Sequence, residues 1–150
     1  MTDEWVLDMS KLKGLEKYVE DIEFQSKWNA IKLQNKRRLA EWIHHNCKIT
    51  VNENSLFDMQ VKRIHEYKRQ LMNVLYIIYR YLTIKDMSPE DRKNVVPRTS
   101  MFSGKAAPAY VNAKLIIKLI NEVSCVINND EQVNSLFKVI FLPNYNVSNA

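Results

Sequence analysis

Two neighbouring stretches of the chain place their apolar residues with the periods of a strand and then of a helix. Over residues 56–64, Phe57, Met59 and Val61 alternate with polar residues, which is typical of a half-buried strand. Over residues 66–85 the apolar positions recur every three or four residues, as on one face of a helix. That face consists of Leu71, Val74, Leu75, Ile78, Tyr79 and Leu82. The pattern therefore predicts a β-α unit.

Further helices are predicted from apolar spacing and from capping residues. The apolar spacing over residues 22–46 predicts a long helix. Ser10 can cap a shorter helix before it, which we expect to end near Gly14. Ser88 and Pro89 have the pattern of a cap and first position of another short helical turn.

Two more strands and one more long helix are predicted toward the C-terminal end. The strands cover residues 95–103 and 137–142, and the second is an almost unbroken apolar run that we expect to be buried on both faces. Between them, Pro108 opens a helix that continues to about residue 128. Its buried face consists of Ala113, Ile116, Ile117, Ile120, Val123 and Ile127. The order β-α-β-α-β implies parallel strands joined by right-handed crossovers.

This order of elements predicts an α/β fold, namely a partial Rossmann-like parallel sheet with flanking helices. We expect residues 1–150 to form a single partial domain, with a helical segment at 1–48 and the β-α-β-α-β core at 55–150. Parallel sheets usually have more than three strands and helices on both faces. We therefore expect the domain to be truncated at its C-terminal end.

Composition narrows the classes of ligand and partner. With two glycines in 150 residues, the chain has neither a glycine-rich phosphate loop nor the GxGxxG pattern of dinucleotide-binding folds. Its net charge of +5 would permit nucleic acid or an acidic membrane as a partner, but a basic run such as Lys36–Arg38 is most often a solvated helix face. No apolar run reaches the roughly 20 residues that span a bilayer. We expect neither nucleic acid nor a membrane as a partner.

The cysteines and histidines do not indicate a metal site. Cys47 and Cys125 lack metal-binding spacing and, with no visible signal peptide, fit a reduced cytoplasmic protein. His44 and His45 end the first long helix, where capping is favoured because further metal ligands are missing. His65 has the chemistry of a general base, but no carboxylate stands at triad spacing, so a structural hydrogen-bonding role is favoured.

The junction between the first strand and its helix concentrates cations. Ligands of open α/β sheets bind at the carboxyl ends of the strands, and a helix N-terminus there favours phosphate. Lys62, Arg63 and Lys68 provide the two or three cations that a phosphate dianion needs. Lys68 and Arg69 are expected in the first turn of the helix, where they oppose the helix dipole. Spacing alone leaves a solvated basic helix start as an equal alternative.

Three stretches of the chain resemble the α-glucan phosphorylases, the glycogen and starch phosphorylases that use pyridoxal phosphate. These stretches are VKRIHEYKRQL at 61–71, VPRT to GKAAP at 96–108, and KVIFL to NY at 138–145. The resemblance spans nearly the whole chain and matches an interior piece of a much longer enzyme. It implies the start of the cofactor-binding, C-terminal domain of a glycosyltransferase-B type fold.

The resemblance also implies an activity and a set of site residues. Inorganic phosphate would attack the terminal glucose of an α-1,4-glucan such as glycogen or starch and release α-D-glucose 1-phosphate. Pyridoxal 5'-phosphate would act through its phosphate, and the lysine that forms its Schiff base is not matched in this chain. The resemblance assigns catalytic roles to Lys62, Arg63 and Lys68, substrate contacts to Arg63 and Tyr67, and cofactor contacts to Lys62, Tyr67, Lys68, Tyr145, Asn146 and Val147.

The loop after the second predicted strand belongs to the same motif set. Gly104 and the two alanines that follow allow a close approach of backbone at a ligand-facing loop. The family usually has further glycines where Ser103 and Ala109 stand here. Tyr110 matches a family tyrosine of a purine-type inhibitor site, but its stacking partner lies outside this chain, so we do not expect that site to function here.

The resemblance implies partners and a location as well. These are inorganic phosphate, an α-1,4-glucan and the remainder of the phosphorylase polypeptide, with a homodimer for the full enzyme and a cytoplasmic location. We expect the chain to have no useful activity alone. The alternative is a non-catalytic interaction module derived from a phosphorylase.

Overall fold

The structure is a computed structural model that describes residues 3–143, and the chain divides into two compact units, Met1–Leu39 and Ala40–Ala150. The first contains two 3-10 helices, η1 (Asp3–Val6) and η2 (Met9–Tyr18), and the first part of helix α1 (Ile22–Cys47). The predicted helix at 22–46 is confirmed.

The short helix before α1 differs from the prediction at both ends. Its N-cap is Asp8, whose carboxylate accepts a 3.0 Å hydrogen bond from the Ser10 backbone N–H, so Ser10 lies inside the helix. The helix continues past Gly14 to Tyr18, and the Tyr18 ring stacks on Phe24 with a centroid distance of 4.9 Å. A carboxylate can cap as well as a hydroxyl can, so two adjacent capping residues left the start of the helix ambiguous.

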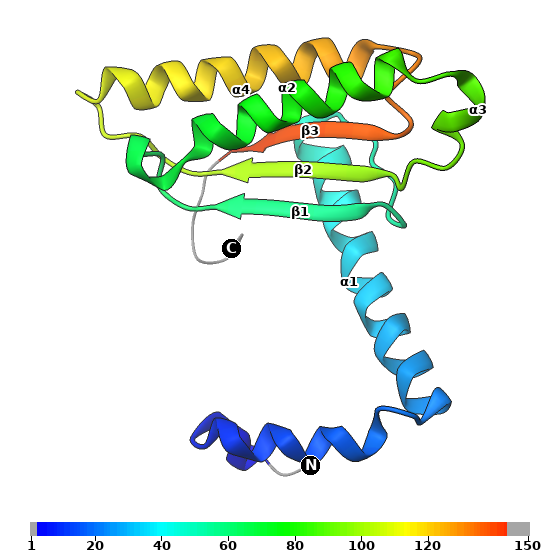
Figure 1. Cartoon of the computed structure of the whole chain (residues 1–150). Helices are drawn as coiled ribbons and strands as arrows, with labels where there is room; N and C mark the ends of the chain where they lie inside the picture. The colour runs from blue at the N-terminus through cyan, green and yellow to red at the C-terminus, as the bar shows by residue number, and fades with distance from the viewer. Residues whose placement is uncertain (1–2, 144–150) are drawn as a thin grey trace. The chain divides into compact units, whose positions relative to one another are not determined.

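The second unit is built on a parallel sheet. Strands β1 (Leu56–Val61), β2 (Arg98–Ser103) and β3 (Phe137–Leu142) are all parallel and lie in the order β1-β2-β3 (Figure 1). The predicted partial Rossmann-like topology is therefore confirmed. The first two strands are shorter than the predicted 56–64 and 95–103, while β3 has the predicted bounds.

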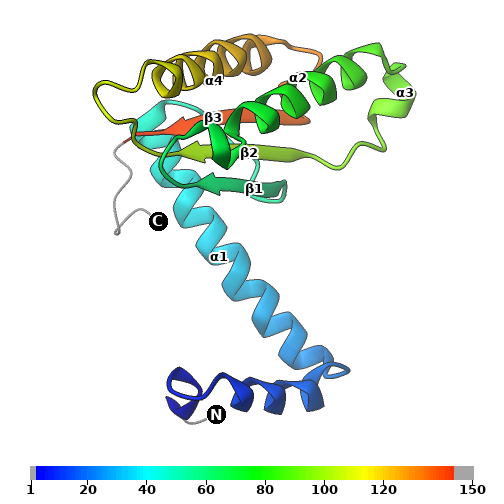
Figure 2. The ribbon, with the colours of Figure 1, turned by 60° about the vertical axis from the view of Figure 1, so that its left-hand side comes forward.

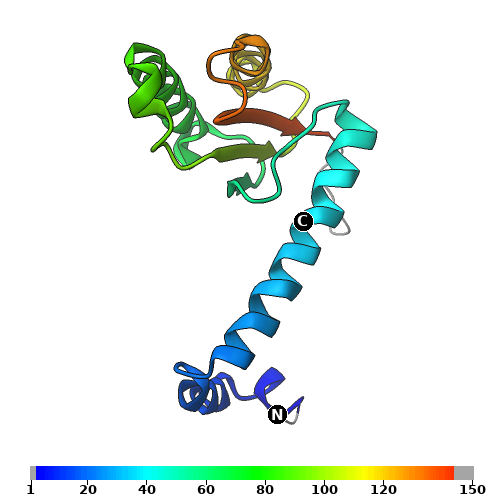
Figure 3. The ribbon, with the colours of Figure 1, turned by 90° about the vertical axis from the view of Figure 1, so that its right-hand side faces the viewer.

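Helices α2 (Gln70–Asp86) and α4 (Val111–Asn129) cover the same face of this sheet (Figures 1 and 3). Right-handed crossovers that advance in one direction along a parallel sheet place their helices on one face. The short helix α3 (Pro89–Arg92) follows α2 (Figure 2). The Ser88 hydroxyl accepts a 3.1 Å hydrogen bond from the Asp91 N–H, as the predicted cap requires.

The core between helices and sheet uses the predicted face of α4 but a face of α2 that only partly overlaps the predicted one. In α4, Ala113, Ile116, Ile120 and Ile127 are buried, and Ile117 and Val123 are half-buried. In α2, the buried residues are Gln70, Val74, Ile77 and Ile84. The predicted face of α2 is confirmed at Val74, which is buried, and at Ile78, which packs against the core. It is wrong at its other four positions, which are exposed, namely Leu71, Leu75, Tyr79 and Leu82. Because α2 is apolar around most of its circumference, periodicity did not identify the buried side.

Strand β1 shows the predicted alternation, but its polar side faces the helices. Gln60 pairs in register with Phe102, which belongs to the core beneath α2 and α4. Gln60 also accepts a 2.9 Å hydrogen bond from the Asn73 side chain of α2. Its apolar side includes Met59, which is in register with buried Met101 on the opposite face of the sheet. None of the helices in the described range is both long and apolar enough to cross a bilayer.

Candidate functional site

The candidate site is a hollow of about 440 Å³ beyond the carboxyl ends of β1 and β2. Its walls come from the segments that follow these two strands. The lining residues are Arg63, Ile64, His65, Tyr67, Lys68, Lys105, Ala106, Ala107 and Tyr110. Ligands of open α/β sheets bind at this end of the strands, so the hollow lies where the sequence predicts a site.

Gly104 allows the two walls of the hollow to meet. A Cβ atom on this residue would stand 2.4 Å from the Lys62 carbonyl oxygen and 2.8 Å from Ile64 Cδ1. The buried Ile64 in turn donates its N–H to the Lys105 carbonyl at 3.2 Å. The backbones after β1 and β2 can approach this closely only because residue 104 has no side chain.

The junction after β1 is a turn and not the start of the helix. Residues Glu66–Lys68 form the 3-10 turn η3, and Arg69 follows with a left-handed backbone (φ 62°) before α2 begins at Gln70. Lys68 and Arg69 therefore precede the helix, and the predicted conflict of both residues with its dipole in the first turn is wrong. The sequence contains no signal for this turn, because left-handed backbone is rare in residues other than glycine.

The cations of the site have no acidic partners within residues 3–143. The side chains of Arg63, Lys68 and Lys105 line the hollow, and none of them forms an ion pair with a described residue. The Lys68 ammonium lies 5.5 Å from the centroid of the Tyr67 ring. An anion that entered the hollow would meet three cations with no carboxylate to displace.

The structure thus brings together some of the sequence-predicted residues. Arg63, Tyr67 and Lys68 share the hollow, whereas Lys62 is exposed and is not among its lining residues. Lys105 is a lining cation that the sequence reasoning did not assign, although its place directly after Gly104 was a usable signal. The three remaining cofactor-contact candidates lie outside the described residues, namely Tyr145, Asn146 and Val147.

A hydrogen-bonded cluster joins the two walls at one side of the hollow. The Tyr110 hydroxyl donates to Glu66 Oε2 at 2.6 Å and accepts from the Glu66 backbone N–H at 3.2 Å. Asn112 Nδ2 donates to Glu66 Oε1 at 3.1 Å. The hydrogen bond to the Glu66 carboxylate raises the pKa of Tyr110. The cluster fixes the turn that carries Tyr67 and Lys68.

His65 lies inside this cluster and is held by aromatic rings. Its ring centroid is 4.2 Å from that of Tyr67 and 4.9 Å from that of Tyr110, and its Nδ1 is 3.4 Å from the Tyr110 hydroxyl. Within the described chain, the His65 ring forms no hydrogen bond with a carboxylate that could orient it as a general base. The geometry agrees with the structural role favoured by the sequence.

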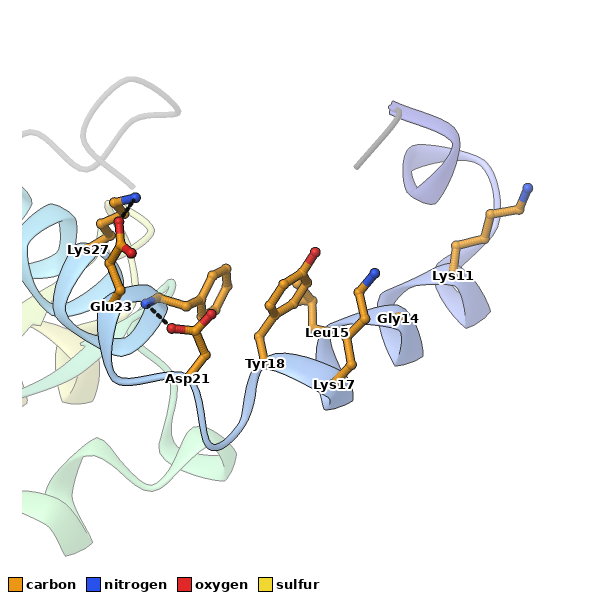
Figure 4. A pocket seen from close by; sticks show the side chains of 9 residues that line it. Lys11, Gly14, Leu15, Lys17, Tyr18, Asp21, Glu23 and Lys27 are labelled. Carbon is orange, nitrogen blue, oxygen red and sulfur yellow. Dashed lines mark hydrogen bonds and ion pairs between the residues drawn. The ribbon is translucent and has the colours of Figure 1, made fainter.

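Two other hollows have geometry that does not suit a ligand site. One, of about 550 Å³, lies in the first unit between η2 and the start of α1 (Figure 4). Its polar groups already pair locally, because Lys27 binds Glu23 at 2.6 Å and Asp21 accepts from the Phe24 N–H at 3.0 Å. The other, of about 430 Å³, lies at the amino ends of the strands, where Ser55 and Thr99 bond to each other at 2.8 Å.

The remaining candidate metal residues form no cluster. Within residues 3–143, no group of three histidine, cysteine or acidic side chains is placed to hold a metal ion. His44 Nδ1 lies 3.2 Å from the Thr50 hydroxyl, beyond the end of α1. Cys47 and Cys125 are both free thiols, and burial raises the pKa of Cys47.

Comparison with known proteins gives matches along the whole chain. Residues 1–150 match the family model described as carbohydrate phosphorylase. The chain is 52% identical over 149 residues to the alpha-glucan phosphorylase, H isozyme, of Solanum tuberosum, and 53% identical over 161 residues to the glycogen phosphorylase of Saccharomyces cerevisiae. Each match covers 99% of this chain and 18% of the relative. The chain therefore spans less than a fifth of the length of these relatives.

Proposed function

The chain belongs to the carbohydrate phosphorylase family, and from this premise we propose that it supplies part of the phosphate and cofactor subsite of an α-1,4-glucan phosphorylase. Such a glycosyltransferase releases α-D-glucose 1-phosphate from glycogen or starch by phosphorolysis. One observation carries the proposal: Arg63, Lys68 and Lys105 line a single hollow at the carboxyl ends of β1 and β2 and form no ion pair within residues 3–143.

The chemistry of these side chains suits a phosphate group. The planar guanidinium of Arg63 can donate two parallel hydrogen bonds to phosphoryl oxygens, while the ammonium groups of Lys68 and Lys105 act as point charges. Tyr67 supplies a hydroxyl at the edge of the same hollow. We propose that Arg63 and Lys68 hold substrate phosphate. Lys62 is a proposed phosphate ligand on the basis of the resemblance alone.

The same residues fit the phosphate end of pyridoxal phosphate. Because Arg63, Lys68 and Lys105 form no ion pair within residues 3–143, they are available to a cofactor phosphate. When bound, this cofactor would supply through its phosphate the group that gives and takes the proton during phosphorolysis. Lys68 and Tyr67 would contact it from this chain, and the lysine of the Schiff base would come from elsewhere in the polypeptide.

The exposed apolar surface beside β1 indicates where the remainder of a phosphorylase polypeptide packs. Leu75 and Tyr79 of α2 are 51% and 68% exposed, and Leu56 and Met59 of β1 are 49% and 46% exposed. In the described chain β1 pairs with β2 alone, so its other edge has backbone groups directed outward. We propose that the remainder of the polypeptide covers this edge of β1 and the exposed face of α2. We also propose that the whole enzyme is a cytoplasmic homodimer.

Reconstitution tests the proposal. The 150-residue chain is assayed for α-D-glucose 1-phosphate formation from glycogen and phosphate, alone and with a Saccharomyces cerevisiae glycogen phosphorylase that lacks its matching segment. We expect no product from either component and product from the mixture with pyridoxal phosphate. A mixture in which the two chains associate but form no product would favour the non-catalytic interaction module. Product from the isolated chain would contradict the division of the site between segments.

A further inference from the structure

Gln70, the first residue of α2, is a fully buried polar side chain with an exposed fraction of 0%. Its Nε2 donates to the Arg63 carbonyl at 3.1 Å, and its Oε1 accepts from the His65 N–H at 3.4 Å. These two backbone groups flank Ile64, whose own N–H bonds to Lys105 on the other side. The Gln70 amide therefore pairs with residues 63–65 as the backbone of an adjacent strand would.

Few other side chains provide this pairing. The pairing with residues 63–65 needs one donor and one acceptor on the same side chain. An amide has both, whereas a carboxylate, an ammonium or a thioether does not. The side chain must also reach from the start of α2 to the segment after β1, across the left-handed Arg69. A buried amide without these bonds would be costly, so the contacts hold the segment as well as the glutamine.

A second amide holds the other end of the cationic segment. Gln60 Nε2 donates to the Lys68 carbonyl at 3.2 Å, and Gln60 Oε1 accepts from Asn73 Nδ2 at 2.9 Å. The backbones of Arg63 and Lys68, the two predicted phosphate ligands that share the hollow, are thus each held by an amide side chain. Both donors come from elements with defined positions, β1 and α2.

We propose that Gln70 is a positioning residue of the phosphate site: its buried amide fixes the backbone on both sides of Ile64 and so sets how Arg63 lies in the hollow. This inference rests on the proposed function for the identity of the anion. The hydrogen bonds between Gln70 and the backbone of residues 63–65 are independent of the proposed function.

The test uses the whole 150-residue chain and the isosteric variant Gln70→Met, which removes both hydrogen bonds. Amide hydrogen exchange of His65 and Ile64 reports on the backbone, and an NMR titration with inorganic phosphate reports on affinity. We expect exchange at His65 to become about tenfold faster and phosphate affinity to fall about fivefold, as loss of one or two hydrogen bonds would produce.

Asn128→Leu is the matched control. The Asn128 amide donates to the Val139 carbonyl at 2.7 Å and accepts from the Val139 N–H at 3.0 Å. It therefore forms the same type of paired hydrogen bonds, here with the backbone of β3. We expect this variant to lower the thermal midpoint and speed exchange at Val139 without changing phosphate affinity. If Gln70→Met lowers the midpoint but leaves phosphate affinity at the wild-type value, the positioning role is wrong.

Three further tests keep the inference separate from the proposed function and from folding. If the wild-type chain does not respond to phosphate, the proposed function fails, and unchanged His65 exchange in Gln70→Met would then overturn the inference independently. If Gln70→Met does not fold, Gln70→Asn keeps an uncharged amide that is one methylene too short to reach both backbone groups, and we expect the same two effects. In the wild type, a Gln70 side-chain amide that exchanges at the rate of a free amide would also overturn it.

Discussion

The hydroxyl of Tyr110 donates a 2.6 Å hydrogen bond to the carboxylate of Glu66, which joins the loop after β2 to the turn after β1. The two residues are 44 positions apart in the chain. Tyr110 lines the hollow, and Glu66 belongs to the turn η3 that carries Lys68, so this bond connects the two walls of the hollow. Loss of this bond should therefore lower the stability of the chain and the order of the turn η3.

Tyr110→Phe should lower the thermal midpoint and speed amide exchange at Glu66, because the Glu66 N–H also donates to this hydroxyl. Tyr67→Phe is the control, since the Tyr67 side chain is 70% exposed and its hydroxyl forms no hydrogen bond with a residue in the range 3–143. Equal midpoints for the two variants would contradict the assigned contact.

The same bond predicts a pH dependence. The Glu66 carboxylate raises the pKa of Tyr110 above its ordinary value of 10.0, because the hydroxyl must keep its proton to donate. The stabilising contribution is therefore complete below pH 10 and is lost as pH rises through the raised pKa. Ultraviolet titration of tyrosine ionisation should show one late-titrating group that moves to lower pH in Glu66→Gln. No shift on that substitution would count against the bond.

A different pH dependence is expected at the other end of α2. Asp130 accepts from Lys85 at 2.5 Å and from Tyr81 at 2.7 Å, and these bonds lower its pKa from 3.8 to about 2. Its contribution to stability is present above pH 3.8 and is lost as pH falls through about 2. Asp130→Asn should lower the unfolding midpoint at about pH 6 and have little effect near pH 2.

An exposed pair provides the control for that measurement. Glu90 binds Lys93 at 2.7 Å, but the side chains are 80% and 69% exposed. Glu90→Gln should leave the midpoint almost unchanged at either pH, because solvent screens such pairs. If Glu90→Gln lowers the unfolding midpoint at neutral pH as much as Asp130→Asn does, burial does not explain why the Asp130 cluster stabilises the fold.

The two glycines of the chain should respond in opposite ways to alanine. A Cβ at Gly104 would overlap the Lys62 carbonyl oxygen, so Gly104→Ala should cost about 1–3 kcal/mol of unfolding free energy and separate the walls of the site. A Cβ at Gly14 would meet no atom within 4 Å, and this residue lies in a helix, so Gly14→Ala should be neutral or stabilise by up to about 1 kcal/mol. Chemical denaturation measures both.

The two faces of α2 should also differ. Ile77 is fully buried, so Ile77→Ala should cost about 2–5 kcal/mol. Leu75 is 51% exposed in this chain, so Leu75→Gln should change the stability of the isolated chain by less than about 0.5 kcal/mol. In the reconstituted mixture, the same Leu75→Gln should weaken association, because we propose that the remaining polypeptide covers this face.

Most of the fold could be predicted because the local signals agree. The three strands, the parallel order and the burial of Ile116 and Ile120 follow from apolar periods and from the alternation of strands with helices. The buried face of α2 could not be predicted, since Leu75 and Ile77 are equally apolar and only tertiary packing distinguishes them. The β1–α2 junction depends on Arg69 in a left-handed conformation, which residue type does not reveal.

The candidate site could be predicted in location and in part of its membership. The cation-rich sequence at the end of β1 indicated Arg63 and Lys68, and the structure places both beside one hollow. Lys105 follows Gly104 in the ligand-facing loop, which was a usable signal, but the role of Gln70 could not be derived from spacing, because its contacts with residues 63 and 65 depend on how the chain turns between β1 and α2. Contacts between distant segments require the fold itself.

We propose above all that the hollow beyond β1 and β2 binds phosphoryl oxygens, and the direct test is an NMR titration of the whole chain with inorganic phosphate. We predict saturable shifts of the amides of residues 63–68 and 104–106, which are lost in Arg63→Ala with Lys68→Ala and retained in Lys93→Ala. Chloride at the same ionic strength should not reproduce them. Phosphate shifts that are absent, spread over the whole basic surface, or unchanged in the double variant would contradict the claim.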